Sequence, residues 1–478
     1  MFKPSHVVVG IAVAAALGLG SVTAVSATTS TPTPSAPTTT PSSTATTTAS
    51  SGSTDPNLFP FGAPTGGQAV KVPSPPGAPT LSPTITTKTT TRLYGSNPYE
   101  EAVSVTQHIW PAVIPLNNPS ENNNDPDRPW GVTLVTTDDP LTAITATPLI
   151  HFPDDAPVLY VTKSGIPSIT LNELKRLGDT GISRYNNVDA FLVGAAANAG
   201  VEKQLKSIGM LYKAVTGSDI PTLADNVDKL YGSIENPDTG VPTMPGYNVM
   251  IGSMTGKDYQ YLLPATHWVA HMPTGLLWVN RTGSIPSATI DALKRRGGAA
   301  QIYLFGGPNQ ISGAVAKQLS QYGNIVRVTN DDPVAFNAPP TDSPEATAVA
   351  FAKMWDPAGG VGWKITGPGH GFTLVNINDW QAAVASAPLS HLGFHAPLLL
   401  TNSATTLSPL LEGYYSSVSP SFLNTPADGP YNMTYAIGSW SQLSWGEQAR
   451  VDYISEMHNR RVVGSDTGST YGDSAPGT

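Results

Sequence analysis

One segment of the chain occurs three times, and this repetition restricts the folds that the sequence can adopt. Residues 157–177 (PVLYVTKSGIPSITLNELKRL) return as residues 276–296 (LLWVNRTGSIPSATIDALKRR) and, more loosely, as residues 397–411 (PLLLTNSATTLSPLL). Each copy begins with an apolar run that is typical of a strand buried on both faces. In the first two copies a Pro-Ser start, apolar residues at helical spacing and a closing glycine predict a helix after it.

Further strands and helices are predicted in the same order around each copy. The units open with a strand and a helix at residues 92–105, at residues 212–230 and from residue 325 onward. A second strand and helix follow, and each of these helices has an aspartate before it as a candidate cap: Asp139, Asp258 and Asp379. Strands that alternate with helices imply parallel sheets with right-handed crossovers. The predicted fold class is α/β, with three parallel-sheet units rather than one continuous sheet.

The N-terminal residues have the composition of an exported protein. Lys3, an apolar run at residues 7–19 and the small residues 25–27 indicate a signal peptide. An uncleaved anchor helix is the alternative, and no second apolar run long enough to span a membrane follows. The next residues are rich in Thr, Ser and Pro, a composition that cannot bury enough apolar surface to fold. We therefore expect a disordered spacer whose Thr and Ser residues are candidates for O-glycosylation.

These observations divide the chain into six parts. We expect a signal peptide at residues 1–27, a disordered spacer at 28–90, repeat units at 91–211, 212–324 and 325–461, and a disordered tail at 462–478. Charged residues make up 12% of the chain, and its formal net charge is −9. Such a chain lacks the basic surface that nucleic acids require of their partners. It contains no cysteine, which excludes disulfides and thiol chemistry.

The order of the motifs resembles the cell wall binding repeat 2 family, whose unit opens RLxGxxRYETA and occurs in three tandem copies. Residues 92–105 (RLYGSNPYEEAVSV) match this opening, and PVLYVT, APLLLT, LKRLG, LKRRG and YLFGG match later elements. The resemblance covers residues 91–457. The chain departs from it at Pro98, where the family has an Arg, and units two and three keep little of the opening helix start.

The resemblance implies a fold and a function. It implies three toprim-like, Rossmann-like units in a pseudo-threefold arrangement. It also implies non-covalent binding to an anionic secondary polymer of a Gram-positive envelope. In the family a separate domain usually carries an activity, whereas this sequence has only the spacer in that place. We therefore expect a secreted, non-enzymatic protein of the cell wall or cell surface.

Histidines were considered as metal ligands and as pH-sensitive groups. The spacing of His267 and His271, and of His391 and His395, is that of half a zinc site, but Gly393 interrupts the second pair. His151, His271 and His391 recur at intervals of 120 residues at the end of the same predicted helix. They are interpreted either as cations favoured at helix C-termini or as imidazoles brought to one shared surface, where they titrate between pH 5 and 8. We predict no metal, no cofactor and no catalytic residue.

The predicted polymer contacts follow the repeated strand. Open parallel sheets bind ligands at the carboxyl ends of their strands, which makes six residues candidates: Thr162, Lys163, Asn280, Arg281, Thr401 and Asn402. The basic residues would contact phosphate or carboxylate groups, and the hydroxyl and amide groups would contact sugars. Arg92 and Arg327, on the opening strands, are further candidates for anion contacts. An ordinary polar loop after a buried strand is the alternative for each.

Two other functions stay open at the level of sequence. The first is a cell-wall amidase or a modifier of one, although no G-x-S-x-G motif or paired-carboxylate arrangement stands out. The second is an extracellular scaffold or protein-interaction module whose polymer site has decayed. The missing opening Arg and the degenerate third unit keep that alternative open.

Overall fold

The computed structural model describes residues 85–113, 127–179, 181–235, 246–328, 342–391, 393–422 and 430–459. The predicted signal peptide and tail, and most of the predicted spacer, lie outside the described residues. The last residues of the predicted spacer belong to the folded part, because Ile85–Thr86 (β1) pairs with Thr90–Leu93 (β2) as an antiparallel hairpin.

Three parallel sheets form the core, one for each predicted repeat. The first sheet has the order β4-β3-β5-β6, the second β10-β9-β7-β8 and the third β1-β2-β14-β11-β12. Apart from the β1 hairpin, all strand pairs in these sheets are parallel. The α/β fold class with parallel sheets is therefore confirmed. The strands are Val132–Thr136 (β3), Val158–Val161 (β4), Ala190–Val193 (β5), Tyr212–Val215 (β6), Asn248–Ser253 (β7), Gly275–Val279 (β8), Ala300–Phe305 (β9), Gly323–Val328 (β10), Gly371–Asn376 (β11), Leu398–Thr401 (β12) and Met433–Ile437 (β14).

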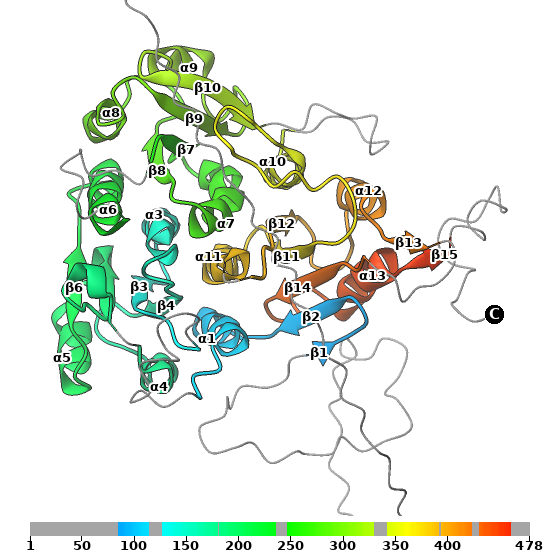
Figure 1. Cartoon of the computed structure of the whole chain (residues 1–478), viewed down its shortest axis with the longest axis horizontal. Coiled ribbons are helices and arrows are strands. Elements are labelled where there is room, and N and C mark those ends of the chain that lie inside the picture. Colours follow the sequence, from blue (N-terminus) through cyan, green and yellow to red (C-terminus); the bar gives the residue numbers. More distant parts are fainter. Residues whose placement is uncertain are drawn as a thin grey trace, which may run out of the picture. The chain divides into compact units, whose positions relative to one another are not determined.

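Helices follow the strands in the predicted order. Repeat 1 has Pro98–Ile109 (α1), Pro140–Thr145 (α3), Ser168–Leu177 (α4) and Ala199–Ser207 (α5). Repeat 2 has Ile220–Glu235 (α6), Leu263–His271 (α7), Ser287–Lys294 (α8) and Gly313–Leu319 (α9). Repeat 3 has Pro344–Lys353 (α10), Trp380–Ala385 (α11), Pro409–Ser417 (α12) and Trp445–Ser455 (α13), and a small pair of strands, Ser421–Phe422 (β13) with His458–Asn459 (β15). Figure 1 shows α3, α7 and α11 lying between the three sheets.

The opening strand of each repeat pairs with the sheet of a different repeat. β6 of repeat 2 pairs with β5 of repeat 1, and β10 of repeat 3 pairs with β9 of repeat 2. β2 of repeat 1 pairs with β14 of repeat 3, which closes the series. The sequence analysis predicted that the opening strand of each unit lies in that unit's own sheet, and this prediction is wrong. The strand can pair in a neighbouring sheet because the helix that follows it crosses back to its own repeat.

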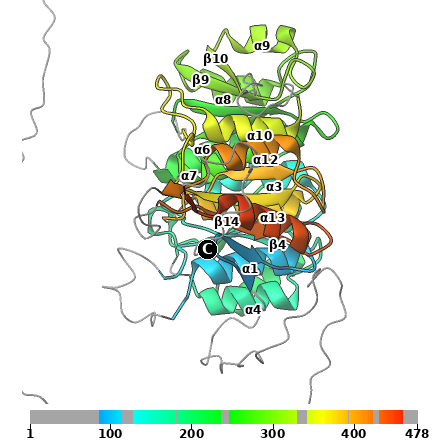
Figure 2. The same cartoon turned by 90° about the vertical axis from the view of Figure 1, so that its right-hand side faces the viewer.

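The helix after each opening strand returns to its own repeat. α1 contacts β4 and α4, α6 contacts β8 and α8, and α10 contacts β12 and α12. Figure 2 shows α1 beside α4 and α10 beside α12. The first two crossings need a glycine, since a Cβ at Gly95 or Gly217 would lie 2.3 Å from the backbone nitrogen of Glu101 or Leu223. Each repeat is thereby joined to the next through both a strand and a helix.

Equivalent polar side chains connect the repeats at their buried contacts. Tyr160 on β4 donates to the carbonyl of Gln381 in repeat 3 (2.7 Å), and Trp278 on β8 donates to Thr145 Oγ1 in repeat 1 (2.7 Å). Gln260 donates to the carbonyl of Ile377 (3.0 Å), and Gln381 donates to that of Thr137 (3.1 Å). These bonds satisfy polar groups that would otherwise be buried at a cost. The repeats therefore pack in one relative order.

The predicted aspartate caps form in two of the three repeats. Asp139 accepts hydrogen bonds from the backbone N–H groups of Leu141 and Thr142 at the start of α3. Asp379 accepts one from Ala382 at the start of α11. Asp258 instead begins a 3-10 turn, Asp258–Leu262, and caps no helix. Its carboxylate is free to pair with another side chain because α7 begins only at Leu263.

A buried carboxyl pair lies where α1 of repeat 1 meets α11 of repeat 3. Glu101 is completely buried and Asp379 is 4% exposed. Burial, and after it the charge of Asp379, raises the pKa of Glu101 well above its ordinary value of 4.5. A raised pKa in the folded state means that folding favours the protonated acid. The stability that depends on this proton is complete below pH 4.5 and is lost as the pH rises through the folded-state pKa.

We expect Glu101→Gln to increase the free energy of unfolding by about 2 kcal/mol at pH 8 and by less at pH 5, because the amide is neutral in both states and need not take up a proton on folding, as Glu101 must above pH 4.5. Urea denaturation at the two pH values measures both changes. Glu100→Gln is the matched control, since Glu100 is more exposed and accepts a hydrogen bond from Ser96 N–H (2.9 Å). A loss of stability in Glu101→Gln at pH 8 would contradict the assignment.

Candidate functional site

The repeated strands β4, β8 and β12 each lie at the edge of their sheet, and the six predicted strand-end residues follow or end them. In repeat 1, Thr162 Oγ1 accepts hydrogen bonds from the N–H groups of Ser164 and Gly165 (3.2 and 3.0 Å) and so forms a tight turn. Lys163 lies on this turn with 67% of its side chain exposed and forms an ion pair with Asp138. The turn presents a cation to solvent at the carboxyl edge of the sheet.

Repeat 2 presents an arginine at the equivalent place. The guanidinium of Arg281 binds both oxygens of Asp258, with Nη2–Oδ1 and Nε–Oδ2 distances of 2.8 and 3.1 Å. The Arg281 side chain is 47% exposed, whereas that of Asp258 is 7% exposed. Asn280 beside it is exposed. A bidentate pair fixes the orientation of the guanidinium while its outer N–H groups remain accessible.

Repeat 3 differs, because carboxyl groups rather than cations lie near its strand end. Thr401 is buried and donates to Glu447 Oε1 (2.7 Å), and exposed Asn402 donates to Glu345 Oε2 (3.3 Å). Burial raises the pKa of Glu447 to about 7 and also raises that of Glu345. The ends of β4 and β8 therefore carry an exposed cation, whereas the end of β12 carries buried carboxyl groups.

The two opening-strand arginines fix the strand pairing between repeats. Arg92 is completely buried; its Nη1 donates to the carbonyl of Gly438 (3.1 Å), and its guanidinium lies 4.2 Å from the ring centre of Trp440. Arg327 donates to the carbonyls of Gly306 (2.6 Å) and Ile311 (2.9 Å). Burial lowers the pKa of both guanidinium groups. Each arginine donates one hydrogen bond to the residue after a neighbouring strand, and another to a residue beyond it: Gln448 on α13 for Arg92, and Ile311 before α9 for Arg327. Because Arg92 is buried, we do not count it among the surface contacts.

His151, His271 and His391 converge where the three repeats meet, together with His395; we call these four residues the histidine junction. Ring centres lie 5.1 Å apart for His151 and His391, and 4.6 Å apart for His271 and His395. The segments that carry the first three histidines contact one another in all three combinations. The sequence hypothesis that packing brings these imidazoles together therefore agrees with the structure.

The junction histidines are held by neutral or acidic partners. His151 Nδ1 lies 2.5 Å from the hydroxyl of Tyr231, and His391 Nε2 lies 2.8 Å from Asp155 Oδ1. His271 stacks on Trp363 with ring centres 5.1 Å apart. Burial lowers the pKa of His151 to about 3 and that of His271 to about 4, and the charge of the neighbouring histidines is the second largest cause. Both imidazoles are thus neutral at neutral pH, and the interpretation as helix-terminal cations is not supported for them. The expected titration between pH 5 and 8 is not supported for them either, because both pKa values lie below that range.

The first histidine pair with zinc-like spacing is divided between two environments, because His271 belongs to the histidine junction and His267 does not. His267 is completely buried, and its Nδ1 lies 2.6 Å from Ser390 Oγ and 2.9 Å from the carbonyl of Ala396. Its ring therefore connects repeats 2 and 3. Within the described residues no group of three or more His, Asp or Glu side chains is placed to hold a metal ion.

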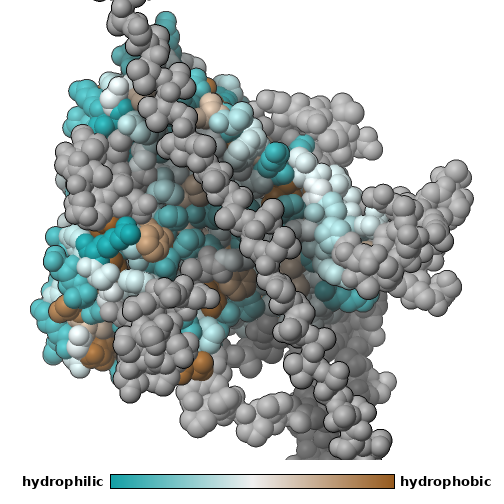
Figure 3. Space-filling model, in the orientation of Figure 1, coloured by the Kyte–Doolittle hydropathy of each residue, from teal (hydrophilic) through white to brown (hydrophobic). Residues whose placement is uncertain are grey.

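The surface shown in Figure 3 is largely hydrophilic where its residues are described, and hydrophobic residues form small separate patches. Phe152 and Met272, which directly follow two junction histidines, are each 39% exposed. Among the described helices, none is both long enough and apolar enough to cross a membrane.

Solved structures that share this fold include two from Clostridium difficile. Cwp6 from Clostridium difficile aligns with a TM-score of 0.56 at 18% sequence identity, over 78% of this chain and 50% of that one. Cwp8 from the same organism aligns with a TM-score of 0.53 at 15% identity, over 77% of this chain and 52% of that one. The chain thus spans about half the length of these two proteins. No family model and no curated protein matches the sequence.

We expect the histidine junction to make the protein less stable as the pH falls below 6.5. Since the folded-state pKa values of His151 and His271 lie below the ordinary 6.5, their contribution is complete above pH 6.5 and is lost as the pH falls toward 4. Changing His151, His271 and His391 together to Gln should reduce the loss in free energy of unfolding between pH 7 and 4.5 by about 1–2 kcal/mol. Denaturant titrations at both pH values measure it, with His458→Gln in β15 as the control. An unchanged pH profile in the triple variant would rule out this role.

Proposed function

We propose that this chain is a cell-wall-associated surface protein and that its repeats bind an anionic polymer of the cell envelope. The fold it shares with Cwp6 and Cwp8, which are cell wall proteins, supports the association with the wall. The sequence resemblance to the cell wall binding repeat 2 family also supports association with the wall, and it is the basis for proposing an anionic polymer as the ligand. Export by a signal peptide and a surface location belong to the same proposal.

The observation that carries the proposal is the equivalent placement of Lys163 and Arg281. Both follow the edge strand of a parallel sheet, both are exposed, and each is held by an aspartate. A cation held in this way can exchange its aspartate for a phosphate or carboxylate of a ligand, or bind it with the N–H groups that remain accessible. Exposed Asn280 adds an amide group suited to sugar, whereas the hydroxyl of Thr162 is used within its own turn and shapes the loop that presents Lys163.

Repeat 3 contributes less to the proposed binding. Its strand end holds Glu345 and Glu447 in place of a cation, and a carboxylate there would repel an anionic polymer. The proposal therefore assigns the anion contacts to repeats 1 and 2, and assigns Arg92 and Arg327 to the joining of the repeats. Thr401 and Asn402 would at most accept neutral parts of a glycan.

The proposed role is binding rather than catalysis. Glu101 and Asp379 form a carboxyl pair with shifted pKa values, yet they are buried between repeats 1 and 3, where a polymer cannot reach them. The spacer, which lies outside the described residues for most of its length, would keep the repeats at a distance from whatever precedes them.

The test is sedimentation of the purified mature chain with isolated cell walls, before and after hydrofluoric acid removes the phosphate-linked polymers. We expect binding to untreated walls, loss of binding after the treatment, and weakening at higher ionic strength because the contacts are electrostatic. The Lys163→Gln, Arg281→Gln double variant should bind at least about tenfold more weakly, since two charge-assisted contacts are removed.

Lys203→Gln with Lys317→Gln is the matched control, because it removes two exposed lysines from helices α5 and α9 and changes the net charge equally. The conservative Lys163→Arg, Arg281→Lys variant should retain binding, which separates charge from folding defects. Binding that survives acid treatment would move the target to peptidoglycan. No binding to either preparation would overturn the proposal.

A further inference from the structure

The connection between the fourth helix and the third buried strand is built differently in repeats 1 and 2. Repeat 2 joins α8 to β9 through residues 295–299, whereas repeat 1 joins α4 to β5 through the longer segment 178–189. In this segment Ile182 and Val188 form an isolated bridge, and Ser183–Tyr185 form a 3-10 turn. Ile182 is completely buried and anchors the segment in the core. The described residues 181–189 of this connection are therefore packed on the core, and insertions of this kind in a repeat often mark a binding face.

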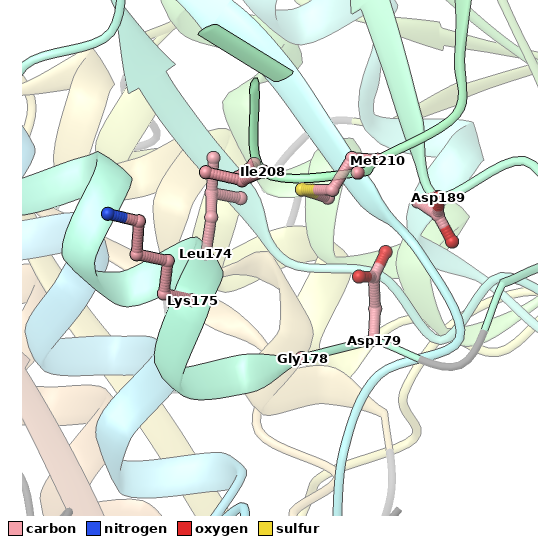
Figure 4. A pocket seen from close by; sticks show the side chains of 8 residues that line it. Leu174, Lys175, Gly178, Asp179, Asp189, Ile208 and Met210 are labelled. Atoms are coloured by element: carbon pink, nitrogen blue, oxygen red, sulfur yellow. The ribbon is translucent and has the colours of Figure 1, made fainter. Parts of the chain in front are cut away.

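A pocket of about 290 Å³ lies beside this connection (Figure 4). It is bounded by the end of α4, the start of β5 and the end of α5, and its lining residues are Leu174, Lys175, Gly178, Asp179, Asp189, Ile208, Gly209 and Met210. The volume is at the lower end for small-molecule sites, which start at roughly 300 Å³. The pocket lies at the amino end of β5, whereas Thr162 and Lys163 follow the carboxyl end of β4. Since the strands are parallel, the pocket and these two residues are at opposite ends of the strands of one sheet.

Two carboxyl groups of the pocket lack a cationic partner among the described residues. Asp179 Oδ2 is buried and accepts no hydrogen bond there. Asp189 Oδ2 accepts the backbone N–H of Leu211 at 2.5 Å, and neither aspartate forms an ion pair within the described part of the chain. Burial, and then the charge of Asp189, raises the pKa of Asp179 to about 8. A positive group placed between the two aspartates would offset the burial of Asp179 and its repulsion from Asp189, the two causes of the raised pKa.

We propose that this pocket binds a small organic molecule that carries an ammonium group, such as an amino sugar. An ammonium has three N–H donors and can satisfy both aspartates at once. Leu174, Ile208 and Met210 supply apolar surface for the carbon skeleton. Divalent hard cations prefer six or more oxygen ligands, which two aspartates do not provide, and this favours an organic cation. The site is separate from the proposed polymer contacts and does not depend on them.

Proton release distinguishes this ligand from a neutral one. At pH 7 most Asp179 carboxyls are protonated, so binding an ammonium ionises Asp179 and releases up to about one proton. A neutral sugar held by hydroxyl hydrogen bonds would leave the proton in place. The number of protons follows from calorimetric titrations in two buffers with different ionisation enthalpies.

The experiment titrates the full mature chain at pH 7 with glucosamine and with glucose, which differ in a single amino or hydroxyl group. We expect saturable binding of glucosamine with proton release, and at least tenfold weaker binding of glucose. Asp179→Asn should weaken glucosamine binding at least tenfold, and Ile208→Trp should block the pocket while leaving both carboxyls. Asp291→Asn, on the exposed face of α8, is the matched control and should bind as the parent does.

Equal binding of glucose and glucosamine would overturn the proposal, and so would unchanged glucosamine binding in Asp179→Asn. Failure of glucosamine to bind the parent, or binding of Ca²⁺ alone at these aspartates, would do the same. Because the readout uses no cell walls, none of these results bears on the polymer proposal.

Discussion

Parallel pairing between strands of successive repeats is the constraint on which the rest of the structure depends. β6 completes the first sheet, β10 the second and β2 the third, so no sheet is complete with the strands of its own repeat. The helix after each strand must then cross to another sheet, and this brings Gly95 and Gly217 against the backbone of the following helix. The Arg92 and Arg327 hydrogen bonds, and the junction of histidines, exist only because the three sheets are joined in this way.

The contacts between repeats place ionisable groups where charge is disfavoured. Glu101 next to Asp379, and His151 next to His391, each bring groups of like charge together in a buried setting. Each therefore favours its neutral form, by a raised pKa in the acid and a lowered pKa in the imidazole. Arg92 keeps its charge through carbonyl hydrogen bonds and the face of Trp440. The repeats thus meet through largely neutral surfaces, in keeping with a chain in which few residues are charged.

The sequence predicted the local structure well and the pairing between repeats poorly. Apolar runs, Pro-Ser starts and glycine stops locate β4, α4, β8 and α8, because these signals act within a few residues. The equal spacing of His151, His271 and His391 raised their meeting as one of two interpretations, and the structure agrees with it. By contrast, no local signal says which sheet an opening strand joins. The pocket at Asp179 was missed because it depends on how residues 178–189 fold against α5, and the burial of Arg92 because its position on a strand does not reveal what lies over it.

The closing of the series by β2 has a consequence for the order of the polypeptide. Thr89 donates its backbone N–H to Asp452 Oδ1 (2.8 Å), and Lys88 forms an ion pair with Glu456, so the β1–β2 hairpin at the start of the described chain is a neighbour of α13 near its end. A circular permutant that joins these ends and opens the chain before β6 would keep every strand pair of the three sheets. The repeats therefore have no intrinsic first member, and duplication followed by a shift of the gene boundary could start such a protein at any of the three.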